Sequence, residues 1–534
     1  MKFSKFLSIT LLSLMLASCN NPSGGPGGVG DKGKTTVTLW AWGDEDEVNV
    51  FQNLAREYNA NNQDNVYINF VKRPSNSYYS GLETALTGRQ APDIFYVGDS
   101  MVKRYAKAGY LEDLTSYINS SSEIDLDDIW KTLMERYQFN PNTYQNSADA
   151  EIWGLPKDIS PTVIFYNEDA FKAQGITVIS AKDDDGDGKV TFNGNTYDAI
   201  GYDATNKVFN NKIAMTFEEL DSISKILSTG KTNASKNQTR WAYYSSWWFY
   251  AGWSVGGDCI QFTETNDAAY NGGYYEFTLD NDNPNYRVLK DCTVNSNSYK
   301  AGEFVSFDDI NYLAENSSKA SELVGDGSLK ALPSIRDMFE YWVSYFKEGY
   351  SPKPMDIGNS LSLFTSQDVA MYVDGRYDVV TFREDCNFAW DVAPLPRHKD
   401  GVSAGHSGSM CISMSKKSKV KAEAFKAIEY LSGKTGQDAL AKTGFNVPNQ
   451  ISLAKDPNAN FLNSDQRPYN NEIFLDAAEV QKGGDWTYLA DDVWIELWAP
   501  TLNTDVLNGS KTIDSLFSEY KKTVNDYLKT YTQK

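Results

Sequence analysis

The chain alternates short β-rich apolar segments with amphipathic helical segments, and this alternation restricts the fold more than any other feature of the sequence. Thr36–Trp42 (TVTLWAW) predicts a strand, and Glu45–Asn59 follows with apolar residues at helical spacing. Val66–Val71 and Asp93–Val97 predict two further strands, and Tyr105–Leu114 predicts a helix after them. Strands that alternate with helices at this rhythm indicate βαβ units around a mixed or parallel sheet.

A second α/β region begins near Leu155. Val163–Tyr166 predicts a strand, and Phe217–Leu227 predicts a helix whose N-cap Thr216 forms a capping box with Glu219. Further amphipathic helices are predicted over Lys419–Leu431 and Ile513–Tyr531. We therefore expect an α/β protein of two lobes, with a chain that crosses between them more than once.

The N-terminus has the parts of an export signal over residues 1–18. Lys2 and Lys5 precede the apolar run Phe6–Leu16, which is too short to span a bilayer. Leu16-Ala17-Ser18-Cys19 resembles a bacterial lipobox, in which Cys19 is lipidated, and residues 19–35 form a Gly/Pro/Ser-rich tether. The alternative is a plain secretory signal with a chance cysteine. We expect a lipid-anchored protein that faces the extracellular or periplasmic side of the membrane.

The composition excludes several classes of partner and catalyst. The 71 acidic residues outnumber the 50 Lys and Arg, and the net charge of −21 would repel nucleic acid. Only His398 and His406 are present, which argues against a multi-histidine zinc site and a Ser-His-Asp triad. In contrast, 33 Tyr and 13 Trp are a large supply of rings that can cover the apolar faces of sugars.

Seven segments resemble, in order, the extracellular solute-binding proteins of carbohydrate ABC importers, the maltose-binding-protein superfamily. They are residues 37–47 (VTLWAWGDEDE), 91–114, 153–176, 215–227, 362–378 (SLFTSQDVAMYVDGRYD), 391–398 (DVAPLPRH) and 415–437. The resemblance covers nearly the whole mature chain.

The resemblance implies a Venus-flytrap fold with one lobe at 36–156 plus 395–444 and the other at 157–394 plus 445–534. It implies a monomeric binding protein, not an enzyme, that captures a neutral sugar or oligosaccharide and delivers it to an ABC permease. A surface glycoside hydrolase using Asp44 and Asp99 is the rival from another class, and a binder of a polyamine or peptide is a third possibility.

Both the residues and the resemblance suggest ligand contacts. Strand ends carry ligand loops in α/β sheets, and a packed ring or a helix cap is the structural alternative at each position. The expected contacts are Trp42, Asp44, Tyr96, Asp99, Asp158, Trp247, Trp248, Arg376 and Tyr377. The resemblance also implies one C-terminal stacking tryptophan, and the choice among Trp486, Trp494 and Trp498 stays open.

Residues 183–194 resemble the start of an EF-hand calcium loop. Carboxylates occupy positions 1, 3 and 5, Gly188 allows the sharp turn at position 6, and position 12 is Gly194 instead of Glu. The expected Ca²⁺ ligands are Asp183, Asp185, Asp187, Lys189 and Thr191, with Asp198 as a candidate for the missing one. The alternative is a solvated acidic turn. No organic cofactor is expected.

Four cysteines remain after the leader, and none of them forms a CxxC pair. They are Cys259, Cys292, Cys386 and Cys411. An exported protein can pair them in three ways, and the sequence does not choose among these.

Overall fold

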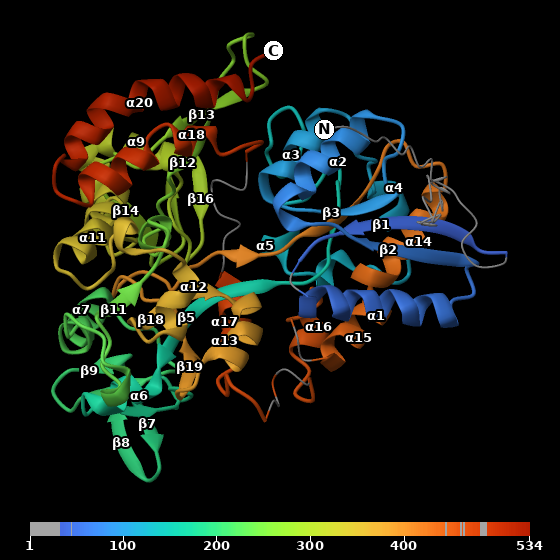
Figure 1. Cartoon of the computed structure of the whole chain (residues 1–534). Helices are drawn as coiled ribbons and strands as arrows, with labels where there is room; N and C mark the ends of the chain where they lie inside the picture. Colours follow the sequence, from blue (N-terminus) through green and yellow to red (C-terminus); the bar gives the residue numbers. More distant parts are fainter. Residues whose placement is uncertain (1–32, 44, 444–445, 460–461, 463–464, 481–488) are drawn as a thin grey trace, which may run out of the picture.

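A computed structural model describes residues 33–534 except 44, 444–445, 460–461, 463–464 and 481–488 (Figure 1). Cys19, Asp44 and Trp486 therefore lie outside the described residues, as does the side chain of Asp99.

Lobe 1 is built on a five-stranded sheet in the order β2-β1-β3-β21-β4, on the right of Figure 1. Its first strand, β1 (Thr35–Ala41), runs parallel to both β2 (Val66–Lys72) and β3 (Ile94–Val97). Two strands from later in the chain, β21 (Cys411–Met414) and β4 (Leu155–Pro156), complete the sheet. The predicted strands and the mixed sheet are confirmed.

Helices cover the lobe 1 sheet. They are α1 (Glu45–Asn61), α2 (Tyr78–Thr87), α3 (Asp99–Lys107), α4 (Thr115–Ile118), α5 (Lys131–Met134), α14 (Lys421–Ser432), α15 (Lys434–Thr443) and α16 (Ile451–Ala454).

The helix predicted over Tyr105–Leu114 was wrong, because α3 ends at Lys107. Gly109 takes a left-handed φ of 71°, and the Tyr110 N–H turns back to the Tyr105 carbonyl at 3.0 Å. A glycine in this conformation terminates a helix, although the apolar spacing continues past it.

Lobe 2 is built on the sheet β11-β18-β5-β19, on the left of Figure 1. Its strands are β11 (Trp241–Tyr244), β18 (Val369–Gly375), β5 (Ser160–Asn167) and β19 (Trp390–Ala393), and β20 (Ser407–Gly408) pairs with the start of β5. Every residue of β5 is buried. Val163 and Phe165 belong to one hydrophobic core, and Ile164 and Tyr166 belong to another, because successive side chains in a strand point to opposite faces.

The helices of lobe 2 are α6 (Glu168–Ala173), α7 (Phe217–Leu227), α8 (Phe249–Trp253), α11 (Ile335–Lys347), α12 (Ser360–Thr365), α13 (Val379–Asp385), α17 (Glu472–Val480), α18 (Val493–Glu496), α19 (Ala499–Thr501) and α20 (Ile513–Thr530). Helices α7, α12 and α17 pack on this sheet, whereas α20 packs on β13 (Gly273–Phe277). The capping box of Thr216 and Glu219 on α7 is confirmed.

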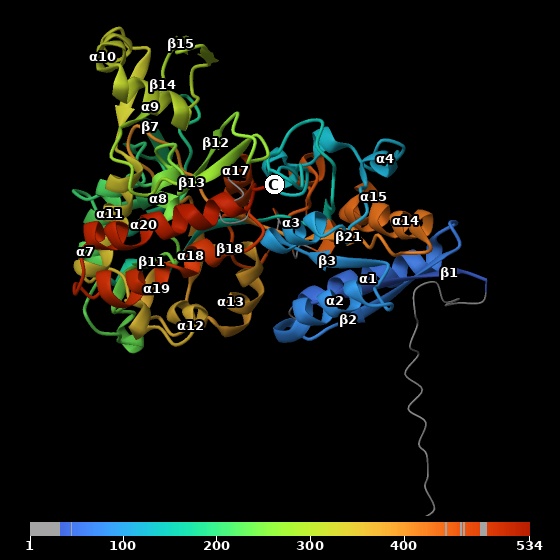
Figure 2. The same cartoon turned by 90° about the horizontal axis from the view of Figure 1, so that it is seen from above.

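Lobe 2 also contains several smaller, separate sheets. They comprise β6 (Thr177–Ile179), β9 (Tyr202–Asp203) and β10 (Val208–Asn210), the hairpin β7 (Lys189–Phe192) and β8 (Asn195–Asp198), and the pair β12 (Ile260–Glu264) and β13 (Gly273–Phe277). A lateral insertion contains β14 (Asn285–Val288), β15 (Cys292–Val294), β16 (Asn297–Tyr299), α9 (Phe307–Glu315), α10 (Ser317–Gly325) and β17 (Leu329–Leu332). Figure 2 shows α10 and β15 at the far edge of the lobe.

The chain passes between the lobes at three places. The first crossing joins β4 to β5, and the second joins β20 to β21. The third comes after α16, because the Asn449 amide donates to the carbonyls of Pro156 and Ser432 and so holds this segment against lobe 1. The second and third crossings therefore lie later than residues 395 and 445, where the sequence placed them, since Leu395 packs in the core of lobe 2 and β20 still pairs with β5.

None of the described helices is long and apolar enough to cross a membrane. All four described cysteines are free thiols, so none of the three possible pairings occurs in this structure.

Candidate functional site

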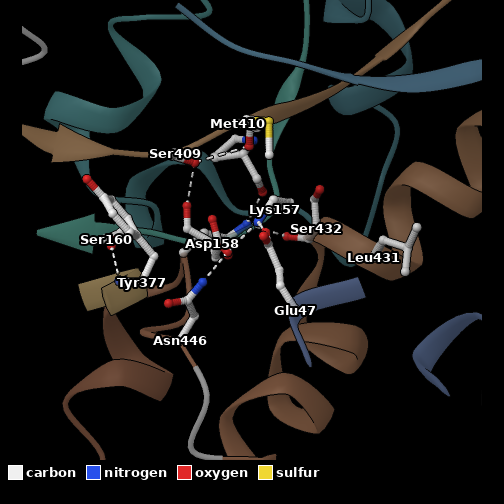
Figure 3. Close-up of polar contacts among 12 residues, drawn as sticks. Glu47, Lys157, Asp158, Ser160, Tyr377, Ser409, Met410, Leu431, Ser432 and Asn446 are labelled. Carbon is white, nitrogen blue, oxygen red and sulfur yellow. Dashed lines mark hydrogen bonds and ion pairs between the residues drawn. The ribbon is translucent and has the colours of Figure 1, made fainter. Parts of the chain in front are cut away.

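A buried charged cluster lies where the first crossing leaves lobe 1 (Figure 3). Lys157 and Asp158 are each 2% exposed, between β4 and β5. The Lys157 ammonium lies 2.5 Å from a carboxylate oxygen of Glu47, near the start of α1, and 2.6 Å from one of Asp158. The Asn446 amide donates to the same Asp158 oxygen. The cluster therefore ties three chain segments together at the base of the interlobe junction.

The one cation of this cluster is paired with two carboxylates. Burial by itself would lower the pKa of Lys157, but the adjoining carboxylates of Asp158 and Glu47 together raise it. The ammonium is thus held charged and is already occupied by two anions. Such a cation is a poor anchor for a further anionic ligand.

Tyr96 supports the charged cluster from inside lobe 1. Its ring is 1% exposed and packs edge-on against Phe51 and Phe70 at centroid distances of 5.9 and 6.5 Å. Lys157 lies 5.6 Å from the ring centroid. The structure thus places Tyr96 in the core beneath the site, whereas the sequence suggested a ligand contact.

Two rings of lobe 1 remain partly exposed beside the end of β1. Trp42 directly follows β1, and Tyr79 lies in the first turn of α2. Their rings meet edge-on at 6.3 Å, and burial raises the pKa of the Tyr79 hydroxyl to about 12. Trp42 was expected here, whereas Tyr79 was missed because its position in an ordinary helical pattern gives no signal. Gly98, which caps α3, packs on Met410 so closely that an added Cβ would lie 3.2 Å from the Met410 side chain.

Tyr377 presents a ring on the lobe 2 side of the junction. The residue is 50% exposed, its N–H donates to the Ser160 hydroxyl at 3.0 Å, and its own hydroxyl donates to the Asp374 carboxylate. A Cβ at Gly375 would lie 2.5 Å from the ring, so only glycine fits before it. Figure 3 shows Tyr377 beside Ser160, across the crossing from Glu47. The ring is therefore positioned by the β5–β18 pairing and left open on one side.

Arg376, the neighbour of Tyr377, is not part of this site. It is fully buried, donates to the Asn471 side-chain oxygen at 2.7 Å, and lies over the Phe474 ring. Burial lowers its pKa to about 9. These contacts make Arg376 a core residue of lobe 2 in this structure.

The aromatic segment after β11 divides into exposed and buried rings. Trp247 is partly exposed and stacks on Phe249 at 5.4 Å and 15°. Trp248 is 4% exposed and packs against Trp498 at 4.9 Å. Trp494 and Trp498 are each 1% exposed. Trp247 is therefore available to a ligand, whereas the other three rings belong to the core.

The acidic loop before β7 shows no ion-binding arrangement in this structure. Asp183 accepts the N–H groups of Asp187 and Gly188 at 3.2 and 3.0 Å, and Asp198 is paired with the Lys189 ammonium. Across the described part of the chain, no three His, Cys, Asp or Glu side chains group around a potential metal position. Calcium binding by Asp183, Asp185, Asp187, Lys189 and Thr191 stays a prediction from the sequence.

Residues 53–462 match the family described as bacterial extracellular solute-binding proteins. The fold is similar to that of an ABC substrate-binding protein from Listeria monocytogenes in complex with cycloalternan, with a TM-score of 0.60 and 17% identity over 92% of this chain and 99% of that one. It is also similar to the cyclic α-maltosyl-1,6-maltose binding protein of Arthrobacter globiformis, with a TM-score of 0.59 and 16% identity over 93% and 100%.

Two curated relatives share shorter segments. An erythritol/L-threitol-binding protein of Mycolicibacterium smegmatis is 27% identical over 140 residues, which are 25% of this chain and 29% of that protein. A maltotriose-binding protein of Pyrococcus abyssi is 35% identical over 86 residues, which are 16% and 18% of the two chains. The matched segments thus span less than a third of each relative.

Proposed function

Because the chain belongs to the bacterial extracellular solute-binding proteins, we propose that it captures a neutral sugar or oligosaccharide between its lobes and delivers it to an ABC permease. One observation carries the choice of ligand. Partly exposed rings lie on both lobes, Trp42 and Tyr79 on one and Tyr377 and Trp247 on the other, and the buried cation at the junction between the lobes is paired with two carboxylates.

The chemistry of sugars suits this arrangement. A pyranose ring has flat C–H faces that pack on aromatic rings and a rim of hydroxyls that bond to polar side chains. The carboxylate of Asp374 accepts a hydrogen bond from the Tyr377 hydroxyl, is partly exposed and can serve as such a partner. The sugar ligands named for several structural neighbours support the same class.

Catalysis is less well supported than binding. A glycoside hydrolase needs two carboxylates about 5–10 Å apart that are free to exchange protons with the substrate. At the described junction, the carboxylates of Glu47 and Asp158 both bond to the same Lys157 ammonium, so they are not a free pair that faces a substrate. Asp44 and the side chain of Asp99 lie outside the described residues.

A thermal-shift screen tests the proposed function. Neutral mono- and oligosaccharides, polyamines and short peptides are added to the mature protein, because a ligand that binds only the native state raises its unfolding temperature. We expect a neutral sugar to raise it, with a gain of about 2.7 kcal/mol at a concentration of 100 Kd. Stabilisation by a polyamine or a peptide alone would overturn the proposal.

We further propose that the protein is a monomer held at the membrane by a lipid on Cys19, with residues 19–35 as its tether. Replacing Cys19 with Ser removes the acceptor thiol, so the variant should move from the membrane to the soluble fraction on cell fractionation. A variant that stays bound to the membrane as firmly as the wild type would contradict lipid anchoring.

A further inference from the structure

A small pocket lies in lobe 2 against Trp247 and encloses about 30 Å³. Its walls come from β11, α7, α8 and α11 and are mainly apolar. The rings that line it belong to Tyr243, Trp247, Tyr250, Tyr341, Trp342 and Tyr345.

The pocket adjoins the proposed sugar site through Tyr250. A side-chain hydrogen bond joins Tyr250 to Thr162 on β5, and Thr162 pairs in register with Gly375, two residues before Tyr377. Trp247, one of the rings available to a ligand, forms another part of the wall. A sugar that contacts Tyr377 and Trp247 therefore lies next to this pocket.

The size of the pocket limits what can enter it. A water molecule needs about 10–15 Å³ of free space in a cavity. A pocket of 30 Å³ therefore admits roughly two small groups and excludes a sugar ring. Where the wall consists of rings alone, a methyl group is favoured over a hydroxyl, because a buried hydroxyl that contacts only rings costs about 1–3 kcal/mol.

One polar atom in the wall lacks a partner. Ser351 is 3% exposed, and its hydroxyl has no hydrogen-bond partner among the described residues. In the same wall, the Tyr341 hydroxyl donates to the Phe217 carbonyl at 3.1 Å, and the Ser245 hydroxyl donates to the Trp247 carbonyl at 3.3 Å. The pocket thus offers apolar walls with a single hydrogen-bonding position to fill.

We propose that the ligand is an N-acetylated sugar whose acetamido group enters this pocket. The methyl group packs among the rings, and the amide carbonyl accepts a hydrogen bond from the Ser351 hydroxyl. This inference rests on the proposed function, since it names the substituent that the sugar carries.

Matched sugar pairs that differ only in the acetamido group provide the test. Calorimetry compares N-acetylglucosamine with glucose, N-acetylgalactosamine with galactose, and N,N′-diacetylchitobiose with cellobiose. We expect the acetylated member of at least one pair to bind about tenfold more tightly or better, which is the range for filling or emptying a small apolar pocket.

Two variants link the preference to the pocket. Ser351→Ala should weaken binding of the acetylated sugar by about two- to tenfold. The affinity for the matched sugar without the acetamido group should stay unchanged. Ala251→Val adds bulk to the pocket wall and should abolish the preference; its thermal unfolding serves as the check on folding. Ser366→Ala, an exposed serine after α12, is the matched control and should behave like the wild type.

The outcomes are separable. Sugars that bind with no preference for the acetylated member, or a preference that survives in both pocket variants, would overturn this inference and leave the proposed function intact. Absence of binding to any sugar would overturn both.

Discussion

Two buried lysines of lobe 1 have opposite surroundings. Lys157 sits between the carboxylates of Glu47 and Asp158. Lys103 is 0% exposed and has no carboxylate in ion-pairing distance among the described side chains. Its ammonium donates to the Arg136 carbonyl and lies 3.7 Å from the centroid of the Phe139 ring. These surroundings predict different responses to substitution and to pH.

Replacing Lys157 with Met should lower the free energy of unfolding by about 3–5 kcal/mol, because two buried carboxylates would face each other without their shared cation. Chemical denaturation of both proteins measures the difference. Lys522→Met is the control, since that ammonium is 88% exposed and its ion pair with Asp526 is worth little. A loss as small as that of the control would show that the junction does not depend on this cluster.

Replacing Lys103 with Met should change stability in a pH-dependent way. Burial lowers the pKa of Lys103 from 10.5 to about 7. The free-energy cost of burying its charge is therefore fully present below pH 7 and is relieved as the pH rises toward 10. The stability of the variant relative to the wild type should therefore fall by about 2–3 kcal/mol between pH 6 and pH 9. Denaturation curves at both pH values provide the measurement. A difference that is constant with pH would mean that Lys103 titrates normally.

At the scale of elements, the hairpin of β7 and β8 carries the sequence-based calcium prediction. Gly186 and Gly188 take left-handed φ angles of 66° and 77°, which supports the sharp turn that the sequence pattern requires. The carboxylates of this turn nevertheless bond to backbone N–H groups and to Lys189 in this structure. The local turn geometry is thus compatible with a calcium loop.

If the loop holds Ca²⁺, adding the ion should raise the unfolding temperature and chelation should lower it, because the ion would bind only the folded hairpin. Asp185→Asn should reduce this response, whereas sugar affinity should stay unchanged. Differential scanning fluorimetry with and without Ca²⁺ makes the comparison. If neither Ca²⁺ nor the chelator changes the unfolding temperature, and the purified protein contains no metal, the loop is an acidic turn.

The whole molecule places its available rings on two lobes joined by three crossings. Trp42 belongs to lobe 1, whereas Tyr377 and Trp247 belong to lobe 2. A ligand held between the lobes therefore contacts rings of both lobes, and loss of a ring on either lobe should weaken its binding.

Trp42→Ala, Tyr377→Ala and Trp247→Ala should each weaken sugar binding by roughly thirtyfold, because removing a stacking partner from a desolvated site costs about 2 kcal/mol. Calorimetry with the cognate sugar measures each change. Tyr312→Ala, a partly buried ring on α9 in the lateral insertion, is the matched control. Wild-type affinity in all three variants would refute a clamp formed by these rings.

The sequence by itself determined the features that depend on local pattern. The alternating segment before Trp42 forms β1, the spacing after Glu45 forms α1, and the capping box starts α7 at Thr216. Each signal is contained in a few neighbouring residues, because side-chain period and capping are properties of one element. The two-lobed α/β fold follows from the order of such elements.

Only the tertiary structure decided which side chains are available. Arg376 and Tyr377 are adjacent, yet the first is fully buried and the second is half exposed, because a tight turn after β18 points them to opposite sides. Lys157 gains Glu47 as an ion-pair partner and Asp158 gains the Asn446 amide as a hydrogen-bond donor, and both of these partners are far away in sequence. Such contacts arise from the register of paired strands and from the crossings between lobes, and neither property is encoded in the spacing of neighbouring residues.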